Sequence, residues 1–174
     1  MITLFVGENN PLTPNFYNKI INNLQFHQLT CPSCDHSGCL YVHGYYIRSV
    51  KSFCKKLKFR ICRVKCECCN HTHAILLSSM VPYSQVSLAD QVAIIDNYET
   101  HQSQESVMSS NPLIDENNIR YIIRFYLNHW KQRLLSEKIS LHPVLGLVHS
   151  CFLHYSRQFM QIKNVPNIIF INTT

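Results

Sequence analysis

Glycine is scarce in this chain, and that scarcity excludes one common class of ligand site. Only four glycines occur among 174 residues, so we do not expect a glycine-rich loop that cradles a phosphate. No apolar run approaches the ~20 residues that a membrane-spanning helix needs. The N-terminus has neither a basic start nor a long apolar stretch, so we expect no signal peptide, no membrane association and a cytoplasmic location.

Acidic residues are missing from the end of the chain. The last one is Glu137, and residues 138–174 contain none. The sequence also has no Ser/His/Asp arrangement, phosphate-binding loop or paired-carboxylate signature. We therefore expect a protein that is not an enzyme and has no small-molecule substrate.

Cysteine is abundant, with nine residues. An odd number argues against a framework of disulfides, and a reduced cytosolic chain with CxxC pairs more often uses its cysteines to bind metal. Four of them form two matched turns, and these are Cys31, Cys34, Cys66 and Cys69. Two cysteines three residues apart on a tight turn present both sulfurs to one ion, and zinc prefers four such ligands in a tetrahedron.

The residue after each CxxC turn supports this interpretation. That position often takes a left-handed backbone conformation, and the residues here are Asp35 and Asn70, which tolerate it best after glycine. We therefore predict one structural Zn²⁺ ion. Four thiolates leave no open position for a catalytic water.

Several alternatives for the cysteines and histidines stay open. The 31 residues between Cys34 and Cys66 exceed a compact spacing, which a long β-hairpin explains; buried free thiols are the competing explanation. Cys68 lies between two predicted ligands and could replace one of them. The other cysteines are better explained as packing or incidental thiols, and these are Cys39, Cys54, Cys62 and Cys151. Four histidines could replace a thiolate or form a second site, namely His36, His43, His71 and His73, although the last two fit better beside the ligands or on the surface.

Hydrophobic periodicity indicates an α+β fold: a small antiparallel zinc ribbon followed by a helical helix-turn-helix region. The expected parts are an N-terminal helical segment (1–30), the ribbon (31–80), the helix-turn-helix (86–140), and a C-terminal helix and tail (141–174). The expected strands are 40–50, 57–65 and 72–77, with a basic hairpin tip at 51–58.

Helix signals fill the rest of the chain. Thr13 and Asn15 lie near the start of an expected helix at 14–25, and Ser87 with Asp90 resembles a capping box. The expected helices in the second half cover 87–99, 103–110, 115–137 and 143–161. Residues 168–171 suit either a strand or a frayed tail.

Positive charge is concentrated in two regions. Residues 31–77 carry eight Lys/Arg against two acids, and residues 114–142 carry five against three. Residues 78–113 between them carry four acids and no Lys/Arg. This distribution is typical of a protein that binds a polyanion, although ordinary variation in surface charge is the simpler alternative.

The two basic regions suggest two kinds of contact with double-stranded DNA, one to bases and one to phosphates. In a helix-turn-helix, the long helix from Asp115 enters the major groove, where Arg and Asn read base edges. The predicted base-contact residues are Asn117, Asn118, Arg120, Tyr121 and Arg124. The predicted phosphate-contact residues of the hairpin are Arg48, Lys51, Lys55, Lys56, Lys58, Arg60 and Arg63. A helical bundle that only buries Ile119, Ile123 and Trp130 is the alternative.

Residues 29–136 resemble a known family. The run Cys31-Pro-Ser-Cys34, the basic hairpin, the run Val64-Lys-Cys66-Glu-Cys-Cys69 and the helices that follow are similar to the N-terminal region of zinc-ribbon insertion-sequence (ISL3-like) transposases. They are also similar to small bacterial proteins with the same ribbon. The resemblance implies four zinc ligands and binding to DNA ends or an operator. Such transposases continue into a nuclease domain with three spaced carboxylates, which we do not expect here.

Other partners remain possible. A zinc ribbon can serve as a protein–protein adaptor, and Tyr45, Tyr46, Phe53 and Phe59 could form an exposed patch for a protein partner or a homodimer. Aromatic and basic side chains on the hairpin could also stack RNA or single-stranded bases.

Overall fold

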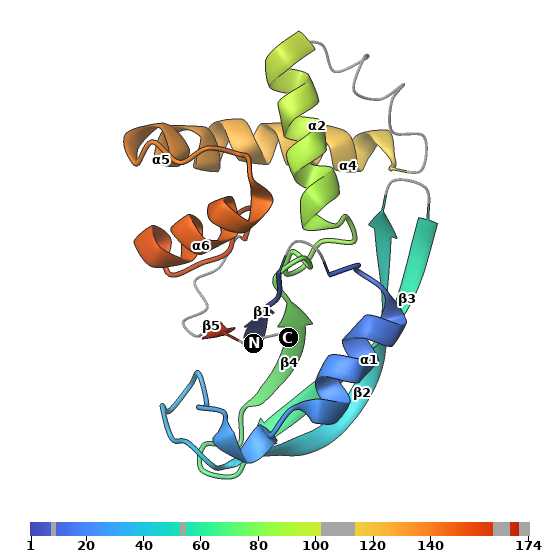
Figure 1. Cartoon of the computed structure of the whole chain (residues 1–174), viewed down its shortest axis with the longest axis vertical. Coiled ribbons are helices and arrows are strands. Elements are labelled where there is room, and N and C mark those ends of the chain that lie inside the picture. The colour runs from blue at the N-terminus through green and yellow to red at the C-terminus, as the bar shows by residue number, and fades with distance from the viewer. Residues whose placement is uncertain (8–9, 53–54, 102–113, 162–167, 171–174) are drawn as a thin grey trace.

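The computed structural model describes residues 1–7, 10–52, 55–101, 114–161 and 168–170. The fold is α+β, as predicted. Five strands form one sheet in the order β2-β3-β4-β1-β5; α1 lies against it, and the other α-helices gather at one end (Figure 1). The strands are β1 (Ile2–Phe5), β2 (Leu40–Ser52), β3 (Lys55–Cys66), β4 (Thr72–Leu77) and β5 (Ile168–Phe170). The helices are α1 (Pro14–Asn23), η1 (Phe26–Gln28), α2 (Leu88–His101), α4 (Glu116–Phe125), η2 (Tyr126–Trp130), α5 (Lys131–Ser136) and α6 (Val144–Tyr155).

The three predicted strands form the antiparallel part of the sheet. β2 pairs with β3 from Leu40↔Cys66 to Ser52↔Lys55, and β3 pairs with β4 over three residues. β2 and β3 are longer than predicted, and β4 has the predicted bounds. Lys51, Lys55, Lys56 and Lys58, expected in the tip, belong to paired strands instead. The register continues without interruption from Gly44↔Arg63 to Ser52↔Lys55.

Two parallel strands, β1 and β5, extend the sheet. The presence of β1 corrects the prediction for the N-terminal segment. The segment 1–30, expected to be helical, begins with strand β1, which pairs in parallel with β4 on one side and β5 on the other. Ile2 and Leu4 of β1 are fully buried. A four-residue run is too short to show a period that separates strand from helix. The tail segment that suited either a strand or a frayed end is a strand over Ile168–Phe170.

Helix α1 secures the place where β3 and β4 separate. Its start is as predicted, with Thr13 Oγ1 accepting a hydrogen bond from the Phe16 N–H and Pro14 in the first position. Beyond the last β3–β4 pair, the Tyr17 hydroxyl accepts from the Cys62 N–H (2.8 Å) and donates to the Ile75 carbonyl (3.0 Å). The hydroxyl thus replaces a missing rung of the ladder. Figure 1 shows the hairpin of β2 and β3 diverging from β4 above this point.

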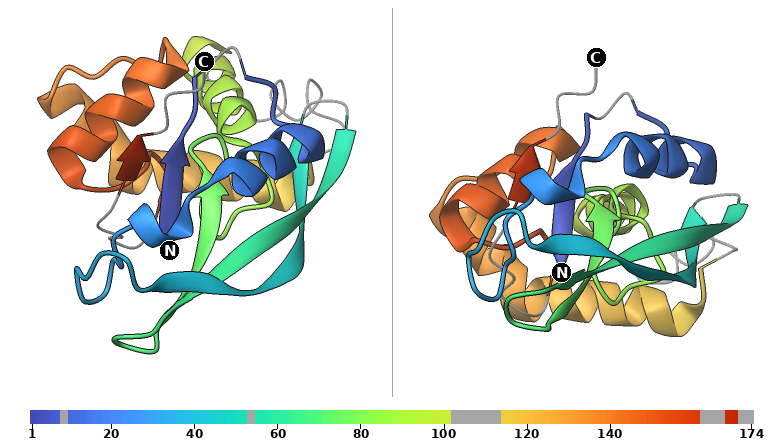
Figure 2. Two further views of the ribbon diagram at one scale, coloured as in Figure 1. Left: turned by 60° about the horizontal axis from the view of Figure 1, so that its bottom comes forward. Right: turned by 90° about the horizontal axis from the view of Figure 1, so that it is seen from below.

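The far end of the hairpin is anchored to the helical half of the molecule. The Lys51 N–H donates to the Gln85 carbonyl, and the Ser87 N–H donates to the Lys51 carbonyl. The Lys51 ammonium forms an ion pair with Asp115, directly before α4. The end of the hairpin and the start of α4 therefore lie side by side (Figures 1 and 2).

The helical half follows its sequence signals. The capping box of α2 is confirmed, because Ser87 Oγ accepts from the Asp90 N–H and also hydrogen-bonds the Asp90 carboxylate. The long helix predicted at 115–137 is confirmed as a continuous run of α4, η2 and α5, in which η2 is a π-helical turn. Its predicted apolar face is buried, namely Ile119, Ile123, Tyr126, Trp130 and Leu134. The short helix predicted at 103–110 lies outside the described residues.

The last helix is shorter than predicted. α6 ends at Tyr155, and Ser156 follows in the left-handed conformation at φ 50°. The Gln158 side chain then donates to the Ser78 carbonyl at the end of β4.

Buried side chains form two clusters that meet near residue 80. The first joins β1 and α1 to the hairpin and β4, and the second joins α2, the long helix and α6. Among the described residues, no helix combines the length and apolar character that crossing a membrane requires.

Candidate metal centre and basic surface

The two CxxC turns fold into equivalent knuckles. In the first, the Asp35 N–H donates to the Cys31 carbonyl at 2.9 Å; in the second, the Asn70 N–H donates to the Cys66 carbonyl at 2.9 Å. Each knuckle closes with a return bond, from the Cys31 N–H to the His36 carbonyl and from the Cys66 N–H to the His71 carbonyl. The first knuckle precedes β2 and the second connects β3 to β4, so the hairpin brings them together.

The left-handed positions are where the sequence predicted them. Asp35 has φ 57° and Asn70 has φ 61°. This conformation turns the chain after the second cysteine of each knuckle so that both sulfurs point to one side. Asp and Asn adopt it at lower cost than other residues with a Cβ.

The four predicted ligands converge on one point. The Sγ atoms of Cys31, Cys34, Cys66 and Cys69 all lie within 4.8 Å of one another. Cys31 Sγ is 3.6 Å from Cys69 Sγ, and Cys34 Sγ is 3.7 Å from Cys66 Sγ. Four sulfurs placed ~2.3 Å from a central zinc would be about 3.8 Å apart. The cluster therefore can hold a metal ion, and we call it the four-cysteine cluster.

His73 of β4 supports the cluster from inside the protein. Its Nε2 lies 3.4 Å from Cys31 Sγ, and the residue is only 5% exposed. Burial lowers the pKa of His73 to about 4, so the ring is neutral at pH 7. A neutral ring with its proton on Nε2 donates to a Cys31 thiolate, which orients that ligand. His71, two residues earlier, is exposed.

The crowded sulfurs differ in how easily they ionise. Burial opposes ionisation of Cys66, but hydrogen bonds from the Cys69 main chain and the Cys39 thiol outweigh it and lower the pKa of Cys66 to about 6. Burial raises the pKa of Cys39 to about 12, and the neighbouring thiols of Cys68 and Cys66 add to that rise. These hydrogen bonds favour the thiolate of Cys66, which is the form of cysteine that binds metal.

The remaining described cysteines fall into two groups. Cys62 and Cys151 are fully buried in the two clusters, as expected of packing thiols. Cys39 and Cys68, in contrast, form a second close group with Cys66. The sequence did not predict the position of Cys39, because the residues next to it in sequence give no sign that its sulfur reaches the second knuckle. Cys54 lies outside the described residues.

The predicted base-contact residues lie on one strip of α4. Asn117, Arg120, Tyr121 and Arg124 are exposed, and the opposite face of the helix is buried. Asn118 is half-buried, and its amide donates to Asp115 Oδ2 at 3.0 Å. Arg120 pairs with Glu116 one turn earlier, and both side chains are more than half exposed. Such a pair costs little to exchange for a phosphate or a base.

The predicted phosphate-contact residues are divided by the structure. Five are exposed on β3, namely Lys55, Lys56, Lys58, Arg60 and Arg63. Two serve the fold instead: the Arg48 guanidinium donates to the Val81 and Ser84 carbonyls at 2.6 Å each, and Lys51 pairs with Asp115. Burial lowers the pKa of Arg48. Of the expected aromatic patch, Tyr45 and Tyr46 are exposed and Phe59 is fully buried.

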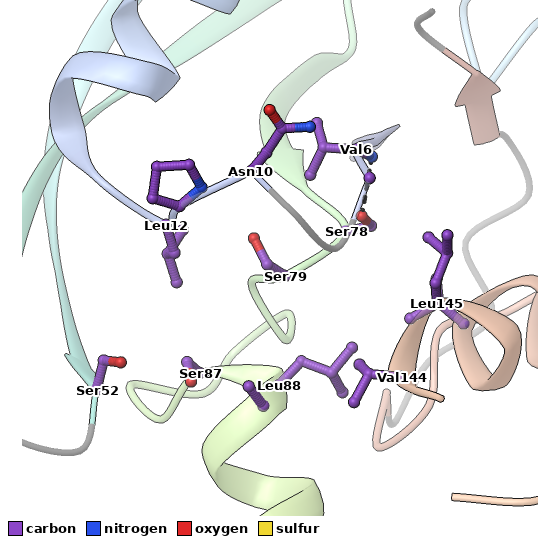
Figure 3. A pocket seen from close by; sticks show the side chains of 14 residues that line it. Val6, Asn10, Leu12, Ser52, Ser78, Ser79, Ser87, Leu88, Val144 and Leu145 are labelled. Carbon is purple, nitrogen blue, oxygen red and sulfur yellow. Dashed lines mark hydrogen bonds between the residues drawn. The ribbon is translucent and has the colours of Figure 1, made fainter. Parts of the chain in front are cut away.

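A cavity of about 440 Å³ lies where β1 and β4 end, beside the starts of α2 and α6 (Figure 3). Its wall is mostly apolar, with Val6, Leu12, Leu88 and Val144 among its lining residues. Two of its serines already serve the fold: Ser78 Oγ accepts from the Val6 N–H, and Ser87 caps α2. The sequence offered no signal for it.

One family model matches the part of the chain that contains the candidate metal centre. Residues 31–115 match a family model described as a domain of unknown function, DUF6431. The match includes both knuckles, the hairpin and α2, and it ends directly before α4. No curated protein and no solved structure matches the chain.

Proposed function

We propose that this protein binds double-stranded DNA, and that the ion of the four-cysteine cluster is a structural Zn²⁺. Four thiolates at nearly tetrahedral spacing favour zinc among the common cellular metals, and they close its coordination shell. The zinc stabilises the base of the hairpin, because it joins the two knuckles there.

The observation that carries the DNA-binding proposal is a pair of exposed basic elements held side by side. Exposed cations follow β3, and the polar strip of α4 lies beyond the end of the same hairpin. The Lys51–Asp115 ion pair joins the two elements. A duplex could contact both, with phosphates on β3 and base edges on α4.

The residues of α4 have the chemistry that base recognition needs. Arg120 and Arg124 can each form two hydrogen bonds to guanine, and Asn117 can do the same with adenine. They project from a helix whose other side is locked into the core by Ile119, Ile122 and Ile123. A rigidly held helix costs little entropy when it binds.

The role that fits these features is recognition of a mobile-element end or an operator. The resemblance to the N-terminal region of insertion-sequence transposases supports it. We assign no strand cleavage to this chain.

The test is a salt-titrated binding assay of the zinc-loaded protein against a random duplex pool, followed by sequencing of the bound fraction. We expect an enriched motif, and we expect Arg120→Ala/Arg124→Ala to lose it, at about 1–3 kcal/mol for each base contact. Lys19→Ala/Lys138→Ala is the matched control, since it removes two exposed charges outside α4 and the hairpin. Uniform binding without a motif in the wild type would overturn sequence recognition.

A test of the ion is independent of DNA. We expect the wild type to retain zinc through dialysis and Cys66→Ser to lose it together with the folded hairpin. Full zinc retention by Cys66→Ser would remove that residue from the ligand set.

Single-strand binding is the second candidate, because one specific contact favours it. The Arg60 guanidinium lies 4.1 Å from the centre of the Tyr45 ring on the exposed side of the hairpin. Such a pair offers a flat surface on which a base can stack. Tighter binding to single-stranded than to duplex probes of equal length would favour this candidate.

A further inference from the structure

Three sulfurs form a group that shares one member with the four-cysteine cluster. Cys39, Cys66 and Cys68 have their Sγ atoms within 4.8 Å of one another, and Cys39 Sγ lies 3.4 Å from Cys66 Sγ. Only Cys66 belongs to both groups. The three sulfurs therefore have the spacing of ligands to one further ion, separate from the first.

The main chain fixes this arrangement. The Glu67 N–H donates to the Cys39 carbonyl at 2.9 Å, directly beside the β2–β3 pair Leu40↔Cys66. This bond extends the ladder by one position and holds Cys39 against the second knuckle. Cys68 occupies the third position of that knuckle, whose turn is closed by the Asn70 hydrogen bond. Neither sulfur depends on a flexible loop for its position.

Packing alone explains these two cysteines poorly. Cys68 is exposed, and an exposed free thiol is prone to oxidation and to reaction with metals. Cys39 is buried, but its sulfur contacts polar partners, namely Cys66 Sγ and the His36 carbonyl. Cys39 also packs in the first hydrophobic cluster, but contacts of its sulfur with a second sulfur and a carbonyl are more than packing requires.

We propose that Cys39, Cys66 and Cys68 bind a second thiophilic d¹⁰ cation, of the class of Zn²⁺ or Cd²⁺, with the Cys66 thiolate bridging the two ions. The first ion with four thiolates carries a net charge of −2. A second divalent ion with two further thiolates adds nothing to that charge, because two negative and two positive charges enter together. The two thiol protons leave to solvent.

The two positions differ in their coordination. The first has four protein ligands, whereas the second has three and an exposed side at Cys68, which leaves one position for water or another small ligand. We therefore expect the second ion to bind more weakly and to exchange faster. This site lies beyond the proposed DNA-binding function, and it requires only that the four-cysteine cluster holds its own ion.

The test is a metal titration of the full chain under a non-thiol reductant, with the bound zinc measured by mass spectrometry of the native protein. We expect two ions for the wild type and one for Cys68→Ser. With ¹¹³Cd²⁺ as the probe, we expect two resonances that share a coupling through the Cys66 sulfur. Cys39→Ser is the second variant, and Cys151→Ser is the control, since Cys151 is buried among the helices.

Each outcome points to one conclusion. One ion in the wild type at excess metal would overturn the second site and leave the first intact. Two ions in both Cys39→Ser and Cys68→Ser would overturn this ligand set. No bound ion in the folded wild type would instead overturn the four-cysteine cluster as a metal centre.

Discussion

At the scale of single residues, His73 shows how the interior of the protein supports the four-cysteine cluster. It is the buried neighbour of Cys31, and it reaches the cluster from β4 rather than from either knuckle. A hydrogen bond to a ligand thiolate spreads its charge and fixes its direction. His73 therefore links the metal centre to the strand that pairs with β1.

We predict that His73→Ala weakens zinc binding about 10–100-fold, because the Cys31 thiolate loses a hydrogen bond that orients it. Competition with a chromophoric chelator measures the affinity. His71→Ala is the matched control, since that ring is exposed two residues away. Equal affinities for the two variants would show that His73 only fills space.

The Tyr17 hydroxyl has a comparable role in the sheet. It satisfies one N–H and one carbonyl that the separating strands leave without partners. Unpaired main-chain groups in a buried position are costly, so a single oxygen allows β3 to leave β4 at this point.

We expect Tyr17→Phe to lower the free energy of unfolding by about 1–3 kcal/mol, because Cys62 N–H and Ile75 carbonyl lose their partner. Urea denaturation of the zinc-saturated protein measures the change. Tyr83→Phe, at a residue 73% exposed, is the control. A loss no larger than the control's would mean that water replaces the hydroxyl.

At the scale of elements, the proposed DNA interface gives different kinds of contact to β3 and α4. The exposed cations of β3 are spread along the strand, and a contact to a phosphate needs only positive charge, so we assign the phosphates to them. The arginines and asparagine of α4 suit base edges. The two elements should therefore respond differently to salt and to sequence.

We predict that Lys58→Ala/Arg60→Ala/Arg63→Ala reduces affinity for all duplexes alike, with the logarithmic salt slope smaller by about 2.7, since each lost phosphate contact removes ~0.9. The preferred motif should stay unchanged. Affinity measured at several salt concentrations tests this, beside the Arg120→Ala/Arg124→Ala variant. An altered motif in the β3 variant would place base contacts on the hairpin.

At the scale of the whole molecule, the presence of two hydrophobic clusters suggests that loss of the metal would affect one half of the protein more than the other. The cluster that includes Cys31 and Cys66 contains β1, α1, the hairpin and β4, whereas the helices have a core of their own. The contacts between the halves include the Arg48 hydrogen bonds to the Val81 and Ser84 carbonyls. Zinc binding should thus stabilise mainly the first half.

We predict that chelation of the metal removes hydrogen-exchange protection from amides of residues 31–77 and leaves most protection in α2, the long helix and α6. A structural ion at the four-cysteine cluster would provide much of the folding free energy around the knuckles. Exchange followed by mass spectrometry locates the change. Uniform loss over the whole chain would show that the two clusters unfold as one unit.

Much of the fold was predictable from local patterns. The knuckles, the left-handed Asp35 and Asn70, the α2 capping box and the buried face of the long helix all depend on residues that are close in sequence. Their geometry depends on residues within one turn or on the period of apolar side chains, so the sequence alone is enough to predict them.

Contacts between distant segments needed the folded molecule. β1 has only four residues, and its strand conformation comes from parallel pairing with β4, more than seventy residues away. Arg48 and Lys51 look like surface cations in sequence, yet the loop before α2 and Asp115 engage them. The sulfur of Cys39 meets Cys66 only because the hairpin register places Leu40 opposite Cys66. The chemistry of a side chain follows from its residue type. Its partner depends on the tertiary structure, which is determined by contacts along the entire chain.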